Sequence, residues 1–216
     1  MTVFDLDGFA DTETTNRLTA LLSDVTIGAI KAAGGNLLLH AGAVARPDGA
    51  TAVLCGASGS GKSTLTAGLG TAGWAYVTDE TVCLDPDTLR ITPFRRPLSI
   101  KVGSHQVLAH LQPDPTYAGS WVVPPSALKG PPLPEQPLLP ELLVFPTYRA
   151  GAQLEVTALS PGEAAFLAGT DSSRLADTRE PLASLARLAR RAPAYRLVHG
   201  DLDAAVLAVS DLLAAA

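Results

Sequence analysis

The sequence has few cysteines, no long apolar run and no cluster of basic residues, and each absence excludes a class of protein. Its two cysteines, Cys55 and Cys83, have neither the spacing of a disulfide framework nor that of a metal site. No apolar run approaches the roughly 18 residues that cross a bilayer, and the acidic start MTVFDLDGFADTE lacks the basic and apolar parts of a signal peptide. These absences predict a reduced, cytoplasmic protein that has no membrane partner.

The charge balance gives no sign of a nucleic-acid partner. The 216 residues include 16 Lys and Arg against 21 Asp and Glu, a formal net charge of −5, whereas nucleic-acid-binding surfaces need basic patches. Hydrophobic residues make up 47% of the chain and charged residues 17%, which is typical of a globular protein. At this length we expect a single domain with a sizeable core.

The most informative stretch that is present runs from Gly56 to Ser63, GASGSGKS, and fits the phosphate-binding pattern G-x-x-x-x-G-K-S/T. The apolar run 51–55 before it predicts a strand, and residues 63–69 after it predict the start of a helix. This is the context that the pattern requires; the alternative is a glycine-rich turn that contains a lysine by chance. The segment therefore predicts binding of a nucleoside triphosphate.

Each position of this loop has a chemical reason. Glycines allow the backbone to curl closely around an anion, and backbone N–H groups at the positive end of a helix attract phosphate oxygens. Lys62 would reach the β- and γ-phosphates, and the Ser63 hydroxyl would bind magnesium. We therefore predict ATP and Mg²⁺ as cofactors. The predicted binding residues are Gly56, Ala57, Ser58, Gly59, Ser60, Gly61, Lys62, Ser63 and Thr64.

The rest of the chain predicts an α/β domain with hairpins around the phosphate loop. The turn Arg46-Pro-Asp-Gly49 predicts a hairpin between 37–45 and 51–55, and Asp85-Pro-Asp-Thr88 predicts a second one. Apolar residues at helical spacing predict a helix over 14–33, namely Leu18, Leu21, Leu22, Val25 and Ala29. Strands are expected at 2–6, 74–78, 97–101, 142–145, around Val156 and at 194–198, and helices at 104–111, after Ser160, at 181–191 and after Asp201. Ser160-Pro-Gly-Glu163 predicts a capping box, and Asp201 is the predicted cap of the last helix.

We expect four parts within a single domain. Residues 1–35 form an N-terminal strand and helix, and 36–112 form the nucleotide-binding core. Residues 113–146 are an irregular excursion because ten of the 17 prolines lie there. Residues 147–216 form a C-terminal αβ segment.

A phosphate loop does not define the reaction, and the acidic pair Asp79-Glu80 is the feature that does. It follows the predicted strand 74–78, at the carboxyl end where open α/β sheets bind ligands. A carboxylate there can hold magnesium, orient water or accept the proton of an attacking hydroxyl. Transporter-type ATPases also carry such a pair, but they need an LSGGQ-like stretch that is absent here. The remaining alternative is that both acids cap a turn in solvent.

The chain resembles the HPr serine kinase family and its shorter relatives, which share a P-loop fold with ATP-dependent phosphoenolpyruvate carboxykinase. The resemblance rests on LLLHAGAV, GASGSGKST, AYVTDE and PLSIK, and is strongest over 37–103. It continues through FPTYRAG (145–151) and the APAYRL…GDLDAAV tail (192–206). It implies a P-loop NTPase fold of the HPr kinase/phosphoenolpyruvate carboxykinase type, with a mixed sheet and a C-terminal α-β-α segment.

By position, the resemblance makes Asp79 the catalytic base that takes the proton from a substrate serine hydroxyl. It makes Glu80 a second acid, which pairs with a basic group or helps Ser63 and Asp79 to hold the metal. His40 would lie beside Asp79 and orient it. As a residue taken alone, His40 could equally be a hydrogen-bonded histidine at the end of a strand.

Two further cations are candidates for stabilising the charge that phosphoryl transfer spreads over three oxygens. Lys101 and Arg149 lie at predicted strand ends and would add to the charge of Lys62; the alternative is that both are solvated surface residues. Arg95 and Arg96 are weaker candidates. We expect the other three histidines to be structural, namely His105, His110 and His199.

Two departures from the family argue against HPr itself as the substrate. The family's EIRG-like core is not recognisable after the acidic pair, where PLSIKVGS stands instead, and the family's separate amino-terminal domain is missing. The shorter relatives are associated with modified-peptide (lasso-peptide-type) gene clusters. The resemblance thus implies an ATP- and Mg²⁺-dependent kinase for a serine hydroxyl of a peptide or protein, with a homo-oligomer possible. The alternatives are a small-molecule hydroxyl kinase and a non-catalytic ATP-binding regulatory module.

Overall fold

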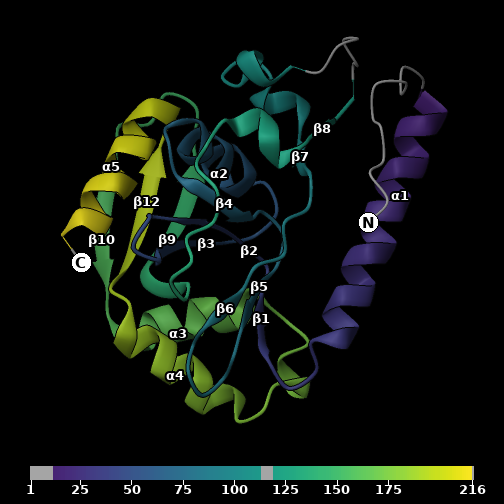
Figure 1. Cartoon of the computed structure of the whole chain (residues 1–216). Coiled ribbons are helices and arrows are strands. Elements are labelled where there is room, and N and C mark those ends of the chain that lie inside the picture. The colour runs from purple at the N-terminus through teal and green to yellow at the C-terminus, as the bar shows by residue number, and fades with distance from the viewer. Residues whose placement is uncertain (1–11, 113–118, 216) are drawn as a thin grey trace.

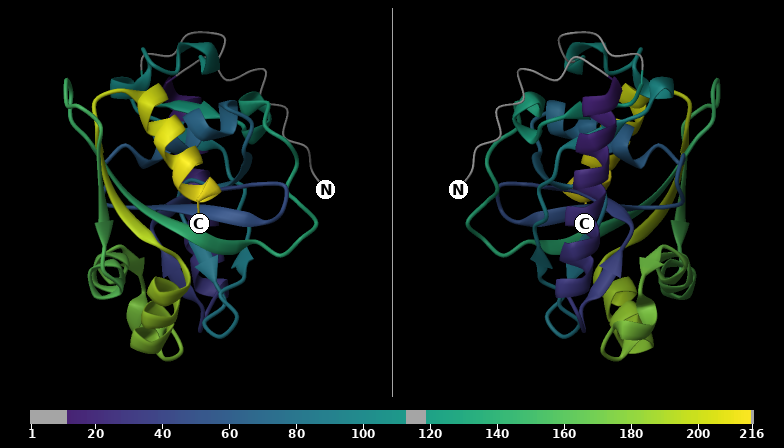
Figure 2. Two further views of the ribbon diagram at one scale, coloured as in Figure 1. Left: turned by 90° about the vertical axis from the view of Figure 1, so that its left-hand side faces the viewer. Right: turned by 90° about the vertical axis from the view of Figure 1, so that its right-hand side faces the viewer.

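A computed structural model describes residues 12–112 and 119–215 of the chain (Figures 1 and 2). The α-helices are α1 (Thr12–Ala32), α2 (Lys62–Thr71), α3 (Pro161–Thr170), α4 (Pro181–Arg191) and α5 (Leu202–Ala214). The strands are β1 (Leu37–Leu39), β2 (Ala41–Ala45), β3 (Ala50–Cys55), β4 (Ala75–Thr78), β5 (Val82–Leu84), β6 (Ile91–Thr92), β7 (Leu98–Ile100), β8 (Trp121–Val123), β9 (Leu139–Tyr148), β10 (Glu155–Leu159), β11 (Ser172–Ser173) and β12 (Ala194–His199).

A mixed six-stranded sheet in the order β10-β12-β9-β3-β2-β4 forms the centre of the molecule. Strands β12, β9 and β3 pair in parallel, whereas β2 pairs antiparallel with both β3 and β4, and β10 pairs antiparallel with β12. The predicted hairpin before the phosphate loop is confirmed as β2–β3, closed by the turn from Arg46 to Gly49. Because β4 is antiparallel to β2, it runs in the same direction as β3, β9 and β12.

Helices cover the two faces of this sheet (Figure 1). On one face, α2 and α5 bury Leu65, Leu69, Val209 and Leu213 against Leu54, Val144 and their neighbours. On the other, α3 and α4 pack Ala164, Ala168, Leu185 and Leu188 against Val53, Leu143 and Phe145, and β1 and β5 join the same core. This layered arrangement is a mixed α/β fold. It follows from strands that are buried on both sides and read as continuous apolar runs.

The smaller sheets contain the second predicted hairpin. Strands β5 and β6 pair antiparallel in a four-stranded sheet ordered β11-β1-β5-β6, and β7 pairs with β8 in a separate ribbon. Trp121 and Val123 of β8 are buried, at 4% and 1% exposed. The helix predicted over 104–111 is instead two short 3₁₀ turns, Val102–Ser104 and Ala109–Leu111.

The irregular proline-rich segment ends earlier than the predicted range 113–146. Its last part belongs to the central strand β9, which begins at Leu139 and includes Pro140 and Pro146. Prolines argue against a central strand because they cannot donate a backbone hydrogen bond. Here Pro140 lies at the irregularity between Thr51 and Ala52 in the β3 pairing, and Pro146 lies near the end of the strand. The strand predicted at 2–6 and residues 113–118 lie outside the described residues.

Local capping explains where the C-terminal helices begin. Ser160 and Glu163 form the predicted capping box at the start of α3, and the Asp201 carboxylate accepts the Ala204 N–H at 2.8 Å at the start of α5. Such caps satisfy N–H groups that have no partner within the helix. Both cysteines are free, as predicted, and both are buried. None of the helices in the described ranges is long and apolar enough to cross a membrane.

Candidate active site at the carboxyl edge of the sheet

The topology brings the predicted site residues to one edge of the sheet. The parallel directions of β3, β4, β9 and β12 place their carboxyl ends at this edge, and β2 begins there. The residues at this edge are therefore His40 before β2, the loop 56–61 after β3, Asp79 and Glu80 after β4, Arg149 after β9 and His199 at the end of β12. Segments that are distant in the sequence thus surround the phosphate loop.

The phosphate loop has the conformation that its glycines were expected to allow. Gly61 has φ 97° and is the N-cap of α2, so a residue with a Cβ would be strained there. A Cβ on Gly61 would also lie 3.4 Å from the Cβ of Tyr148. Gly56 has φ 146°, and the Ser60 hydroxyl lies 2.9 Å from the position a Cβ would take there. The loop is therefore closely packed from both sides.

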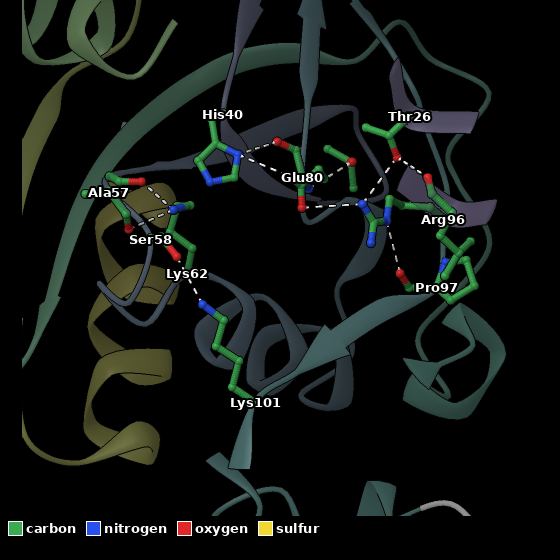
Figure 3. A network of polar contacts seen from close by, with 12 residues as sticks. Thr26, His40, Ala57, Ser58, Lys62, Glu80, Arg96, Pro97 and Lys101 are labelled. Atoms are coloured by element: carbon green, nitrogen blue, oxygen red, sulfur yellow. Dashed lines mark hydrogen bonds and ion pairs between the residues drawn. The ribbon is translucent and has the colours of Figure 1, made fainter. Parts of the chain in front are cut away.

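Lys62 lies inside the curve of this loop (Figure 3). Its ammonium group donates to the carbonyl oxygens of Gly56 and, at 3.0 Å, of Ala57. The residue is 5% exposed, and burial lowers the pKa of its ammonium group. A buried cation held by two carbonyls at a helix N-terminus is well placed to exchange these partners for phosphate oxygens.

Asp79 is the most deeply buried acid of the site. The residue is 3% exposed, and its Oδ1 atom has no hydrogen-bond partner. Burial raises the pKa of Asp79 from 3.8 to about 6, while Arg96, the Ser63 hydroxyl and the Ser99 backbone N–H act in the opposite direction. The structure thus brings together Ser63 and Asp79, two of the three residues that were predicted to hold a metal ion.

Glu80 has two basic partners, which is the first of the two roles expected for it. Its carboxylate lies 3.3 Å from His40 Nδ1 and 3.4 Å from an Arg96 guanidinium nitrogen (Figure 3). The hydrogen bond between His40 and Glu80 lowers the pKa of Glu80 and raises that of His40. His40 was expected to orient Asp79, but the partner found for it is Glu80. The reason is that β1 and β2 present the ring to the residue after Asp79, whose carbonyl also lies 3.1 Å from Nδ1.

The two additional cations differ in their placement. Lys101, which follows β7, donates to the Ser58 hydroxyl at the tip of the loop at 3.0 Å (Figure 3). Arg149 follows β9 at the same edge, and its backbone N–H bonds the His199 carbonyl at 2.9 Å, but its side chain is exposed. Arg96, the weaker candidate, is the one in contact with the acidic pair, and its guanidinium also bonds Thr26 of α1.

Two residues of this region were not predicted as functional. His199 was expected to be structural, yet its Nε2 atom is buried, has no partner and lies 3.8 Å from the position of a Cβ on Gly61. Asp171, after α3, bonds the His40 N–H through its backbone carbonyl at 2.7 Å. Neither belongs to a contiguous motif; only the fold brings them to the loop.

The polar atoms around the loop fit a bound anion and a cation. Of four buried side-chain atoms without a partner in the described part of the chain, three lie at this edge: Ser60 Oγ, Asp79 Oδ1 and His199 Nε2. Buried polar atoms are hydrogen-bonded in nearly all proteins, so these three are available to bind a ligand. Within the described ranges, no group of three or more His, Cys, Asp or Glu could enclose a metal. Mg²⁺ does not require one, since it is commonly held by one or two carboxylates together with substrate phosphates.

Comparison of the sequence with models of known protein families and with curated proteins gave no match in either case. The functional interpretation therefore depends on the geometry of the site and on the motifs that it contains.

Proposed function

We propose that this chain is an ATP- and Mg²⁺-dependent kinase of the HPr serine kinase type, with a P-loop NTPase fold. It would transfer the γ-phosphate of ATP to the hydroxyl of a serine, or a similar alcohol, on a peptide or protein. The observation that carries this proposal is the placement of the buried Asp79 carboxylate beside Ser63, at the first turn of the helix that follows the phosphate loop.

On the nucleotide side, the loop 56–61 and the N-terminus of α2 would bind the phosphates through backbone N–H groups. Lys62 would exchange its bonds to Gly56 and Ala57 for bonds to the β- and γ-phosphates. Ser63 and Asp79 would hold Mg²⁺, which supplies charge neutralisation for the phosphates. Lys101, at the tip of the loop, would place a second positive charge near the transferred group.

On the acceptor side, Asp79 would take the proton of the attacking hydroxyl. The hydroxyl oxygen forms a bond to the γ-phosphorus, the bond from that phosphorus to the β–γ bridging oxygen breaks, and ADP leaves. A pKa of about 6 keeps Asp79 ionised at neutral pH and makes it a stronger base than an exposed aspartate. Glu80 is already paired with His40 and Arg96, which leaves Asp79 as the acid with an unpartnered oxygen.

The proposal is tested with Asp79→Asn. Wild-type and variant proteins are each incubated with γ-labelled ATP, Mg²⁺ and a library of serine-containing peptides, and ATP affinity is measured by calorimetry without Mg²⁺, so that loss of the proposed metal ligand does not affect it. We expect the variant to lose about 10²–10⁴-fold in transfer, the contribution typical of a positioned general base, and to keep ATP affinity within a few-fold. Asp24→Asn, which removes an exposed aspartate of α1, is the matched control and should retain full transfer.

The other outcomes distinguish the alternatives. ATP binding without transfer to any peptide or small alcohol would support a regulatory nucleotide-binding module instead. Transfer to small alcohols alone would assign a small-molecule kinase. Phosphate found on aspartate or histidine of the product, rather than on serine or threonine, would contradict the proposed chemistry.

A further inference from the structure

Asp171 is an acid that the proposed mechanism does not use, although it lies beside the phosphate loop. It directly follows α3, and its backbone carbonyl accepts the His40 N–H at 2.7 Å. The next two residues form β11, which pairs antiparallel with β1 in the register Leu39↔Ser172. Backbone pairing on both sides therefore fixes Asp171 next to His40.

The pairing of the strands places His40 and Asp171 near the part of the phosphate loop that holds Lys62. Ala41, which follows His40, is paired with Cys55, which precedes the phosphate loop. His40 and Gly56 are therefore the chain neighbours of one paired position, and the Gly56 carbonyl accepts a bond from the Lys62 ammonium. Asp171 lies next to His40 at the same edge, because its backbone carbonyl accepts the His40 N–H.

The charges of this cluster agree with that geometry. Burial raises the pKa of Asp171, and Lys62 is the strongest influence in the opposite direction. Asp171 is likewise the leading influence that counters the effect of burial on Lys62, and the buried Cys55 thiol is affected by both. No ion pair joins the two side chains directly, so they interact through space.

The position is unfavourable for an aspartate on grounds of stability alone. A helix C-terminus carries partial negative charge and favours cations, yet Asp171 is the C-cap of α3 and is partly buried. His40 and Lys62 are the positive groups that compensate for it.

We propose that Asp171 is the resident counter-charge of Lys62 and sets the affinity of the phosphate loop for polyphosphates. In the free protein it stabilises the buried ammonium group, and bound phosphates must compete with it for that charge. Asp171 is thus a positioning residue that keeps nucleotide affinity moderate, so that product ADP can leave. The inference rests on the proposed nucleotide-binding function.

The test compares Asp171→Asn with wild-type protein by calorimetry, with ATP, inorganic tripolyphosphate and adenosine as probes. We expect the variant to bind ATP and tripolyphosphate about three- to tenfold more tightly, and adenosine unchanged. The gain should shrink at 0.5–1 M salt, roughly the range in which screening shortens the reach of a partly exposed charge. A purely structural role of Asp171 would weaken binding instead.

Two matched variants complete the design. Asp177→Asn removes one charge from an exposed residue that is paired with Arg174 on the same segment, and should leave all three affinities unchanged. Asp171→Glu keeps the charge, and its affinities should remain within about twofold of those of wild type. If Asp171→Asn does not fold, a comparison of Asp171→Glu with Asp171→Gln replaces it, because these two variants differ by one charge.

Unchanged or weakened polyphosphate binding in Asp171→Asn would overturn the inference, and so would an equal gain in Asp177→Asn, which would reflect net charge only. Failure of the wild-type protein to bind either ATP or tripolyphosphate would overturn the proposed function together with this inference. Binding by wild type without a response to Asp171 would overturn the inference alone.

Discussion

Asp79 combines burial with an unpartnered carboxylate oxygen, and this combination makes the stability of the protein depend on pH. Its pKa is raised to about 6 in the folded protein, from 3.8 for an unperturbed aspartate. Between these values the folded state binds more protons than the unfolded state. The contribution of Asp79 to stability is therefore most favourable below about pH 4, falls as the pH rises towards 6, and stays at its lowest value above that.

Asp79→Asn removes the loss of stability that ionisation of the buried Asp79 carboxyl causes as the pH rises. We expect the variant to exceed wild type in free energy of unfolding by about 1–3 kcal/mol at pH 7.5 without Mg²⁺, and the difference to vanish near pH 4. Urea denaturation at a series of pH values measures it, with Asp24→Asn as a control for loss of an acid. A variant that is no more stable than wild type at pH 7.5 would contradict the assigned environment of Asp79.

Lys62→Ala tests the other half of the site at the same scale. The ammonium group would contact phosphates and not the nucleoside, so the variant should lose about 10- to 100-fold in affinity for ATP, as expected for a charged hydrogen bond. Affinity for adenosine should stay within about twofold by the same reasoning. Calorimetry with both ligands measures the contrast, and Lys31→Ala in α1 is the control. An equal loss of affinity for both ligands would contradict the proposed contact between Lys62 and the phosphates.

At the scale of elements, the packing of α2 on β2 depends on one glycine. A Cβ on Gly42 would collide with the hydroxyl of Thr66, which is buried in α2 and has no partner. We expect Gly42→Ala to destabilise the fold by about 1–3 kcal/mol, the usual cost of an overpacked core. In a Thr66→Ala background the cost should be clearly smaller, because the colliding atom is gone.

Thermal and urea denaturation of the four proteins in this cycle measure the coupling. Gly28→Ala is the control: a Cβ there meets nothing within 4 Å, and the residue lies within α1. It should stabilise the protein by up to about 1 kcal/mol, since alanine is the better helix former. Additive costs for Gly42→Ala and Thr66→Ala would show that the two residues do not compete for space.

Most elements could be predicted because their signals are local. The turn from Arg46 to Gly49, the Ser160–Glu163 capping box and the Asp201 cap act within a few residues, and the structure has them where they were expected. β9 was predicted too short because its prolines argue against a strand, whereas the register irregularity beside Pro140 accommodates one of them.

The site was predictable only to the extent that it is contiguous in the sequence. The loop 56–63 and the pair Asp79-Glu80 could be found because each is one short stretch beside a strand. The partner of His40 depends on the pairing of β2 with β4, and the position of Asp171 depends on the pairing of β1 with β11. No local pattern contains that information, so an alignment of coupled positions or a structure is needed.

At the scale of the whole molecule, α1 stands apart from the layered core. It lies on the side opposite α5 (Figures 1 and 2), and Leu21, Val25 and Ile27 of this helix are about half exposed. A polar chain joins it to the site: the Thr26 hydroxyl accepts from Arg96 at 3.3 Å, and Arg96 pairs with Glu80 (Figure 3). Because these three apolar side chains are only half buried, the polar contact through Thr26 should contribute to the attachment of α1.

Thr26→Val keeps the shape of the side chain and removes the acceptor for Arg96. We expect amide hydrogens of α1 to exchange several-fold faster in this variant, while those of β3 and β9 remain unchanged, because local opening of α1 does not require unfolding of the core. Hydrogen exchange read by mass spectrometry resolves the two regions. Thr170→Val is the matched control, since Thr26 and Thr170 both donate to a carbonyl of their own helix at 2.7 Å and only Thr26 bonds Arg96. If α1 exchanges equally in all three proteins, the helix is held by its remaining contacts, and Arg96 serves the acidic pair alone.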